Sequence, residues 1–239
     1  MRVLLSAAAL SIFLLTGTTR ADASTYDLTT DWSDLVNPNG VWSYGDSIGA
    51  ITVQQSAYLA AGQKAWAFSN GGPGVIASWL RTSQNGLPQL DYLLGDVITG
   101  PWDGNVGQPG RGPASVVRWT SPIEGTIDVS GFTWNAHLSG GQAIDWSLSV
   151  DGNVFQSGTL ASNGISSRSA TTPFAQTGIA VQTGDVLAFS FQPNNFFANW
   201  AGLSLTIETN PGESVVMEPA SAGMLAIGVI GLLARRRRA

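Results

Sequence analysis

Apolar and polar residues alternate along several stretches in the middle of this 239-residue chain. The clearest stretch is AIDWSLSV, residues 143–150, in which every second residue from Ile144 to Val150 is apolar and the residues between them are Asp or Ser. A period of two is typical of a β-strand with one buried face. Asp151-Gly152 and the stretch NVFQSGTL, residues 153–160, follow directly. This order predicts a β-hairpin closed by a tight turn.

Comparable strand patterns recur, separated by turn residues, and no long stretch between residues 26 and 209 has a helical period. The further predicted strands lie within residues 49–55, 64–69, 74–80, 115–121, 125–134, 184–192 and 202–208. About ten short strands in one domain predict an all-β fold over residues 24–210, a two-sheet sandwich of jelly-roll type. A closed barrel is the alternative. Residues 85–113 are the least regular part, and they begin with a run that could form one short helix or strand. The segment is expected to be a long loop, which is often functional.

The composition limits what this domain can bind. Charged residues make up 11% of the chain, against about 25% in typical soluble domains. Between residues 24 and 218 there are five basic and 15 acidic residues, a net charge of −10. Such a domain repels phosphates, which excludes nucleic acid as a partner. The chain has no cysteine, which excludes disulfides, thiol catalysis and cysteine-bound zinc.

The N-terminal segment has the order of a secretory signal peptide. Arg2 precedes an apolar run over residues 3–15, and a polar stretch then ends in an A-x-A pattern formed by Ala21 and Ala23. We predict a signal peptide over the first 23 residues, export by the Sec machinery and cleavage between Ala23 and Ser24. An uncleaved first helix is the alternative.

The C-terminal segment, residues 211–239, ends in an apolar run followed by a basic cluster of Arg235, Arg236, Arg237 and Arg238. The predicted apolar helix, residues 220–234, would rise about 22 Å, short of the roughly 30 Å of a bilayer core. The arginines are expected to stay in the cytoplasm and to leave the domain outside. A segment this short suits a temporary stop in the membrane. A permanent anchor and a buried core helix are the alternatives.

Four segments in the order NPNGVWSYG (37–45), SVVRWTSPIEGTIDVSGF (115–132), VDGNVFQSG (150–158) and VQTGDVLAFSF (181–191) resemble the β-sandwich domain of exported PEP-CTERM proteins. The tail resembles the PEP-CTERM sorting signal, a motif followed by an apolar helix and a basic cluster. The motif corresponds here to Met217, Glu218, Pro219 and Ala220. This resemblance implies recognition by exosortase, a membrane transpeptidase, with cleavage near Glu218-Pro219 and a transient stay in the inner membrane of a Gram-negative-type bacterium.

The sequence holds little that indicates catalysis. Its one histidine, His137, has no nucleophile motif beside it and is expected at a loop or strand end. Paired carboxylates could hydrolyse glycosides, and the available ones are Asp31, Asp34, Asp46, Asp96, Asp103 and Asp145. The two DGN segments offer oxygen ligands for calcium, but the one at residues 151–153 is better explained as a hairpin turn. We therefore expect no catalytic residue, metal or cofactor.

Aromatic residues suggest a sharper hypothesis, because exposed rings can stack on sugars. Trp42, Tyr44 and Trp102 with Asp103 lie in turn-rich segments and are the candidates, whereas Trp119, Trp134 and Trp146 lie on predicted strands and are expected in the core. The predicted function is a non-catalytic protein of the cell surface or extracellular matrix, associated with exopolysaccharide or biofilm. A carbohydrate-binding module is the alternative, and a glycan-active hydrolase or lyase is a weaker one.

Overall fold

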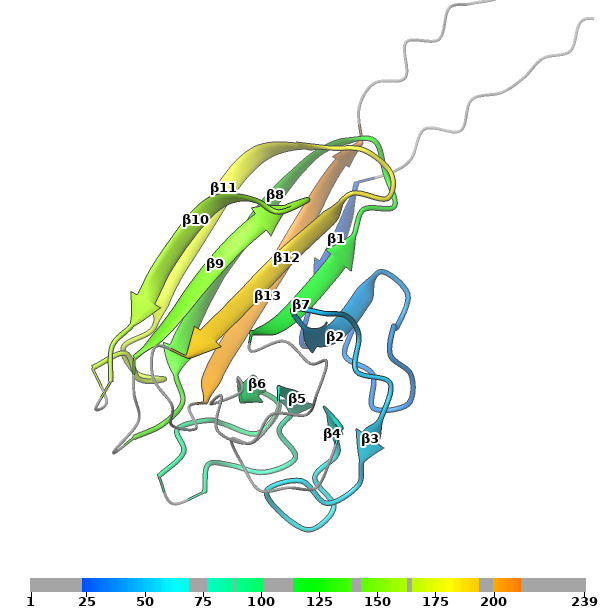
Figure 1. The fold of residues 1–239 in the computed structure, drawn as a ribbon. Coiled ribbons are helices and arrows are strands. Elements are labelled where there is room, and N and C mark those ends of the chain that lie inside the picture. Colours follow the sequence, from blue (N-terminus) through cyan, green and yellow to red (C-terminus); the bar gives the residue numbers. More distant parts are fainter. Residues whose placement is uncertain are drawn as a thin grey trace, which may run out of the picture. The chain divides into compact units, whose positions relative to one another are not determined.

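The computed structural model describes residues 23–68, 77–87, 89–100, 114–138, 143–162, 165–193 and 200–211. These residues form 13 strands in two antiparallel sheets, which confirms the predicted all-β sandwich (Figure 1). Each sheet ends in edge strands, so the alternative of a closed barrel is wrong. No helix in the described ranges could span a membrane. The predicted signal peptide and apolar tail helix lie outside these ranges, apart from Ala23 and Ser24 at the cleavage position.

The smaller sheet has five strands in the order β10-β9-β12-β7-β2. Their bounds are β2 Trp42–Asp46, β7 Ser115–Thr120, β9 Ile144–Val150, β10 Asn153–Leu160 and β12 Val186–Pro193. The predicted hairpin is confirmed, because β9 and β10 pair directly. Asp151 and Gly152 in its turn have φ of 48° and 80°, as a tight hairpin turn with two left-handed residues requires.

The larger sheet has eight strands, in the order β11-β8-β13-β6-β5-β4-β3, with β1 also paired to β13. Their bounds are β1 Ser24–Asp27, β3 Gln54–Gln55, β4 Ala65–Ala67, β5 Ser78–Arg81, β6 Val97–Gly100, β8 Gly125–Asn135, β11 Thr172–Val181 and β13 Ala201–Pro211. The sequence patterns did not predict β1, β2 or β11. β6 lies within residues 85–113, the irregular segment for which one short helix or strand was allowed.

The main core lies between the two sheets and is rich in aromatic side chains. Trp146 of β9 stacks on Phe189 of β12, with ring centroids 5.4 Å apart. Phe174 of β11 packs against both rings, at 5.9 Å from Trp146 and 5.1 Å from Phe189. These contacts join an edge strand of the larger sheet to the middle of the smaller one. Trp119, Trp134 and Trp146 are at most 5% exposed, which confirms that they are core residues.

A second apolar cluster covers part of the larger sheet. It includes Tyr58 and Tyr92 from the connecting loops and Trp134 and Trp200 from the sheet region, all buried. The Trp134 indole lies against Gly202 and donates a hydrogen bond to the carbonyl oxygen of Asp91 at 2.8 Å. The larger sheet is therefore covered by loops over this region.

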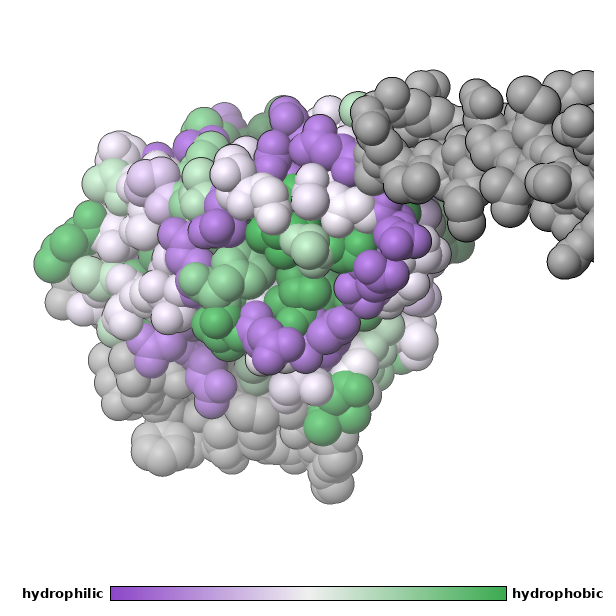
Figure 2. All heavy atoms as spheres, turned by 90° about the horizontal axis from the view of Figure 1, so that it is seen from above, coloured by the Kyte–Doolittle hydropathy of each residue, from purple (hydrophilic) through white to green (hydrophobic). Residues whose placement is uncertain are grey.

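The two ends of the described domain lie together. Ser24 pairs with Thr209 across β1 and β13, so the chain enters and leaves at the same end of the sandwich (Figure 1). Seen from above, the surface shows apolar residues surrounded by a rim of hydrophilic ones (Figure 2). Several apolar side chains that pack on the main core, among them Ile123, Phe155 and Ile179, are only partly buried.

Candidate functional site: a polar groove on the five-stranded sheet

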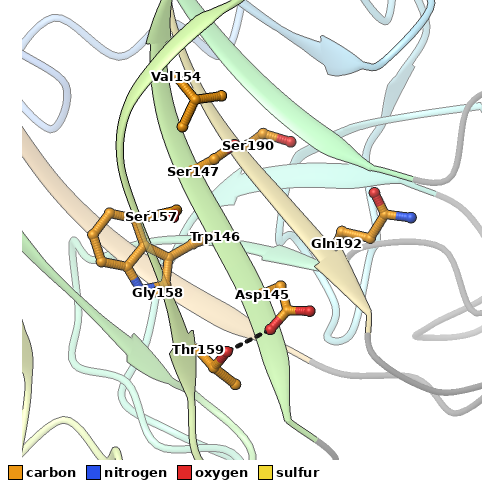
Figure 3. Close-up of a pocket in the computed structure, with 9 residues that line it drawn as sticks. All are labelled: Asp145, Trp146, Ser147, Val154, Ser157, Gly158, Thr159, Ser190 and Gln192. Carbon is orange, nitrogen blue, oxygen red and sulfur yellow. Dashed lines mark hydrogen bonds between the residues drawn. The ribbon is translucent and has the colours of Figure 1, made fainter.

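The outer face of the smaller sheet carries an open groove with a volume of about 610 Å³. It crosses β10, β9 and β12 (Figure 3). Its lining side chains are mainly small and polar: Asp145, Ser147, Ser157, Thr159, Ser190 and Gln192, with Val154, Trp146 and Gly158. The groove exists because β9 alternates. Its apolar residues Ile144, Trp146 and Leu148 are buried in the core, which leaves the polar residues between them on the opposite face.

The strand register arranges these polar side chains in two rows. Ser147 lies directly opposite Ser157 of β10 and Ser190 of β12, which makes a row of three hydroxyl groups. Asp145 lies opposite Thr159 and Gln192 in the next row. Neighbouring strands are about 4.8 Å apart and alternate residues along a strand about 7 Å. The six side chains therefore form a compact grid on a rigid sheet.

Asp145 is tied to this grid by a hydrogen bond. The Thr159 hydroxyl donates to Asp145 Oδ1 at 2.6 Å, as Figure 3 shows. A carboxylate accepts hydrogen bonds and offers about four acceptor positions. Serine and threonine hydroxyls both donate and accept, and the Gln192 amide does the same. The groove thus presents donors and acceptors together within a small area.

Gly158 and Trp146 meet on the core side of the sheet beneath the groove. A Cβ atom at Gly158 would lie 2.9 Å from Trp146 Nε1, so only glycine lets the indole pack under β10. Trp146 is 5% exposed and stacks on Phe189. Its ring is therefore part of the core and does not offer an open stacking face to a ligand.

Charge is scarce on this face. Asp145 is the one ionisable side chain that lines the groove among the described residues. Arg118 of β7 lies opposite Ala188 of β12, and its Nη2 donates to the carbonyl oxygen of Asp46 at 2.7 Å. Burial lowers the pKa of Arg118 while the nearby Asp46 raises it. Arg118 Nη1 is buried without a hydrogen-bond partner among the described residues, so the guanidinium is held within the protein through Nη2.

The predicted stacking residues Trp42 and Tyr44 are not exposed, and this expectation is corrected. They lie on β2 and are 1% and 0% exposed. Trp42 Nε1 donates to Asp31 Oδ2 at 3.1 Å, and the Tyr44 ring packs against Trp32 with centroids 4.1 Å apart. The surrounding turn residues concealed a strand whose alternate side chains face the core.

The remaining predicted site residues fall outside the described part of the chain. These residues are Trp102 and Asp103 of the sugar-binding set, Met217, Glu218, Pro219 and Ala220 of the sorting motif, Arg235, Arg236, Arg237 and Arg238 of the basic cluster, and Ala21 before the cleavage position. Ala23 directly precedes β1, and Ser24 begins it.

Three of the carboxylates considered for catalysis have structural partners. Asp34 accepts a hydrogen bond from Trp32 Nε1 at 2.9 Å. Asp46 accepts the backbone N–H groups of Ile48 and Gly49, and Asp96 pairs with Arg168 Nε at 3.0 Å.

The other groups considered for chemistry are structural too. His137 follows the end of β8 and forms a single β-bridge with Leu90, as expected for a residue at a strand end. Asp151 lies in the hairpin turn, and its Oδ1 accepts the N–H of Val186 at the start of β12 at 2.9 Å. Within the described ranges, no three His, Cys, Asp or Glu side chains gather as metal ligands would.

Only some of the groove residues could be predicted from the sequence. Asp145 was among the candidate carboxylates, but Ser147, Ser157, Thr159, Ser190 and Gln192 were missed. Their signal is the polar half of the strand alternation. That alternation identifies an outward face, and the pairing of β10, β9 and β12 then brings the three polar halves together.

No family model matches the chain, and no curated protein matches its sequence. Among solved structures, the CBM36-1 domain of a xylanase from the hindgut metagenome of Trinervitermes trinervoides shares 15% identity, with 46% of this chain and 86% of that chain covered and a TM-score of 0.29. A CBM61 module in complex with β-1,4-galactotriose shares 11% identity over 55% and 80% of the two chains, with a TM-score of 0.34. A CBM35 from Paenibacillus barcinonensis shares 11% over 76% and 97%, with a TM-score of 0.29.

Proposed function

We propose that the protein is an exported, non-catalytic protein of the cell surface or extracellular matrix whose β-sandwich binds polysaccharide. The observation that carries this proposal is the groove on β10, β9 and β12, with its two rows of hydroxyl, carboxylate and amide groups. Sugars are recognised by such groups, because each ring carries several hydroxyls that donate and accept at once.

The form of the groove suits a polymer. It is open along the sheet, so a chain can pass over it without having to end inside it. Its side chains come from regular strands with short hydroxyl-bearing residues, which lose little rotamer freedom on binding. A preformed site of this kind lowers the ordering cost that usually weakens association.

The structural roles of the carboxylates support the proposal that the protein is not catalytic. A glycosidase needs two carboxyl groups about 5–10 Å apart across the scissile bond. In the groove, Asp145 is the one carboxylate among the described lining residues. Asp34 accepts a hydrogen bond from Trp32, and Asp46 accepts the N–H of Ile48 in a turn. Asp96 forms an ion pair with Arg168.

Export and sorting belong to the same proposal. The N-terminal pattern supports Sec export, and the tail supports recognition by exosortase after a transient stop in the inner membrane. The chain leaves the domain at Pro211, at the end of β13, beside Gly125. The groove row of Asp145 and Gln192 lies toward the opposite end of the smaller sheet (Figure 1).

Binding is tested by retardation of the whole protein in gels that contain soluble polysaccharides, including the exopolysaccharide of its own host. Ser147→Arg places a long charged side chain in the middle of the groove and is expected to abolish the retardation. The matched control is Ser130→Arg, at an exposed position of β8 on the other sheet, which should keep it. If no polysaccharide retards the protein, or both variants behave alike, binding in this groove is refuted.

Processing is tested separately by intact mass measurement of the protein recovered from the cell surface. The expected mature chain begins at Ser24 and lacks the four arginines from Arg235 to Arg238. Surface protein that retains Arg238 would contradict cleavage of the tail and favour a permanent anchor.

A further inference from the structure

We infer that the groove binds glycans whose sugars carry methyl groups, and that Val154 is the residue that contacts the methyl group. The inference rests on the proposed polysaccharide binding and goes further, because it assigns the chemical class of the sugar. It starts from an apolar side chain in a lining that is mainly polar: Val154 lines the groove and is 58% exposed.

A β-bulge places Val154 on the polar face of the sheet. The register between β10 and β9 shifts between Val154 and Gln156, and Gln156 lies opposite Leu148, which is buried in the core. In an unbroken strand Val154 would share that inward face, because side chains alternate with a period of two. The extra residue, Phe155, packs on the main core, and Val154 lies opposite the outward Ser149. Bulges re-aim side chains in this way next to functional sites.

The bulge gives the groove a third row of side chains. Val154 and Ala188 of β12 lie on the two sides of Ser149, so both outer positions of this row carry methyl groups. The row of three serines that includes Ser147 is its neighbour, about 7 Å away along the strands. Figure 3 shows Val154 at the end of the groove away from Thr159. The lining therefore changes from hydroxyl groups to methyl groups over the width of about one sugar ring.

This change of lining favours a particular kind of sugar. A ring that lies across the two rows places its hydroxyls on the serines and one substituent against Val154. A hydroxymethyl group would lose hydration there and gain no hydrogen bond from valine, which costs free energy. A methyl group gains free energy when it is removed from water. Two kinds of sugar supply it: a 6-deoxy sugar, in which methyl replaces hydroxymethyl, and an acetylated sugar.

The test compares sugars that differ only in this group, by chemical-shift titration of the whole protein. L-Rhamnose and L-fucose are paired with L-mannose and L-galactose, which carry hydroxymethyl in place of methyl. We expect each deoxy sugar to bind about fourfold more tightly than its partner, the effect of burying one methyl group, and to shift the methyl signals of Val154. N-Acetylglucosamine against glucose tests the second source, and a preference confined to that pair assigns the methyl group to acetyl.

The variant Val154→Thr replaces one methyl group by a hydroxyl and keeps the β-branched shape that suits a strand. It should abolish the preference within the pair that shows it. The matched control is Val36→Thr, at a valine that is 52% exposed in the loop between β1 and β2, and it should keep the preference.

The outcomes separate the two claims. The methyl inference is overturned if no methyl-bearing sugar binds more tightly than its partner, or if none of the sugars binds although a polysaccharide retards the protein. It is overturned too if Val154→Thr keeps the preference or weakens both sugars of a pair alike. In each of these cases polysaccharide binding, measured by gel retardation, stands. If none of the sugars binds and no polysaccharide retards the protein, the proposed function itself is refuted.

Discussion

Replacing Gly202 by alanine should strongly destabilise the sandwich, because the Trp134 indole occupies the space that a side chain would need. A Cβ atom at Gly202 would lie 2.0 Å from Cζ2 and 2.1 Å from Cε2 of Trp134. Trp134 is 1% exposed, and Arg168 stacks over its ring with Cζ 4.9 Å from the centroid. The ring can therefore move only by giving up its present contacts.

The magnitude follows from those contacts. Overpacking a filled core costs about 1–3 kcal/mol. Displacing the ring also weakens the hydrogen bond from Trp134 Nε1 to Asp91, worth about 1 kcal/mol, and the cation–π contact with Arg168, worth about 0.5–1 kcal/mol. The free energy of unfolding should fall by about 3 kcal/mol, and Tm by roughly 6–12 °C for a domain of this size.

The assay is thermal and urea unfolding followed by tryptophan fluorescence, with Gly49→Ala as the matched control. Gly49 lies in the loop after β2, and a Cβ atom there would meet nothing within 4 Å. This control should unfold within about 0.5 kcal/mol of the wild type. A Gly202→Ala variant as stable as Gly49→Ala would refute the close packing of Trp134 on β13.

Three further predictions concern stability. Gly158→Ala should lower the free energy of unfolding by about 1–3 kcal/mol, since the new Cβ would lie 2.9 Å from Trp146 Nε1; unchanged urea unfolding would show that the indole is free to shift. Arg168→Lys should lower Tm by a few degrees, because lysine cannot keep the two-nitrogen contact with Asp96; an unchanged Tm would mean that this ion pair contributes nothing. Burial raises the pKa of Tyr44 above its usual value of 10. The raised pKa stabilises the folded protein fully below pH 10, and this contribution is lost as the pH rises above 10, by up to about 1.4 kcal/mol per pH unit. Tyr44→Phe should therefore make the alkaline decline in the free energy of urea unfolding shallower. An equally steep decline in the variant would contradict the role of Tyr44 in it.

The strands with clean alternation could be predicted from sequence because their information is local. In β9 the period of two identifies the buried face, and Asp151-Gly152 supplies the two left-handed residues of the turn. The order of strands in each sheet is not local, and the sequence indicated only two sheets.

The segment around β2 shows why other elements were missed. The residues NPNGVWSYG are rich in turn formers, and the expected loop is instead held as a strand by side-chain hydrogen bonds. Asn37 Nδ2 donates to the carbonyl oxygens of Tyr44 and Ile51, both at 2.7 Å, and its Oδ1 accepts the N–H of Tyr44 at 2.9 Å. These contacts place Trp42 and Tyr44 in the core, although composition suggested that both lie at the surface.

The groove, like the strand order, could not be predicted from local sequence, because it depends on pairing between strands that are distant in the chain. The outward position of Asp145 and Ser147 follows from alternation alone. Their partners on β10 and β12 lie 10 to 47 residues away in sequence and meet them only through the sheet register. The larger sheet has an outward face too, but loops and the cluster around Trp134 cover part of it.

The central claim is that polysaccharide binds on the outer face of β10, β9 and β12. The most direct measurement is an amide chemical-shift titration of the protein with oligosaccharides of the polymer that retards it. The account predicts that the largest shifts fall at residues 145–147, 157–159 and 190–192, with little change at the exposed middle of β8 around Ser130. Shifts confined to the larger sheet or its loops, or no shift at saturating oligosaccharide, would contradict it.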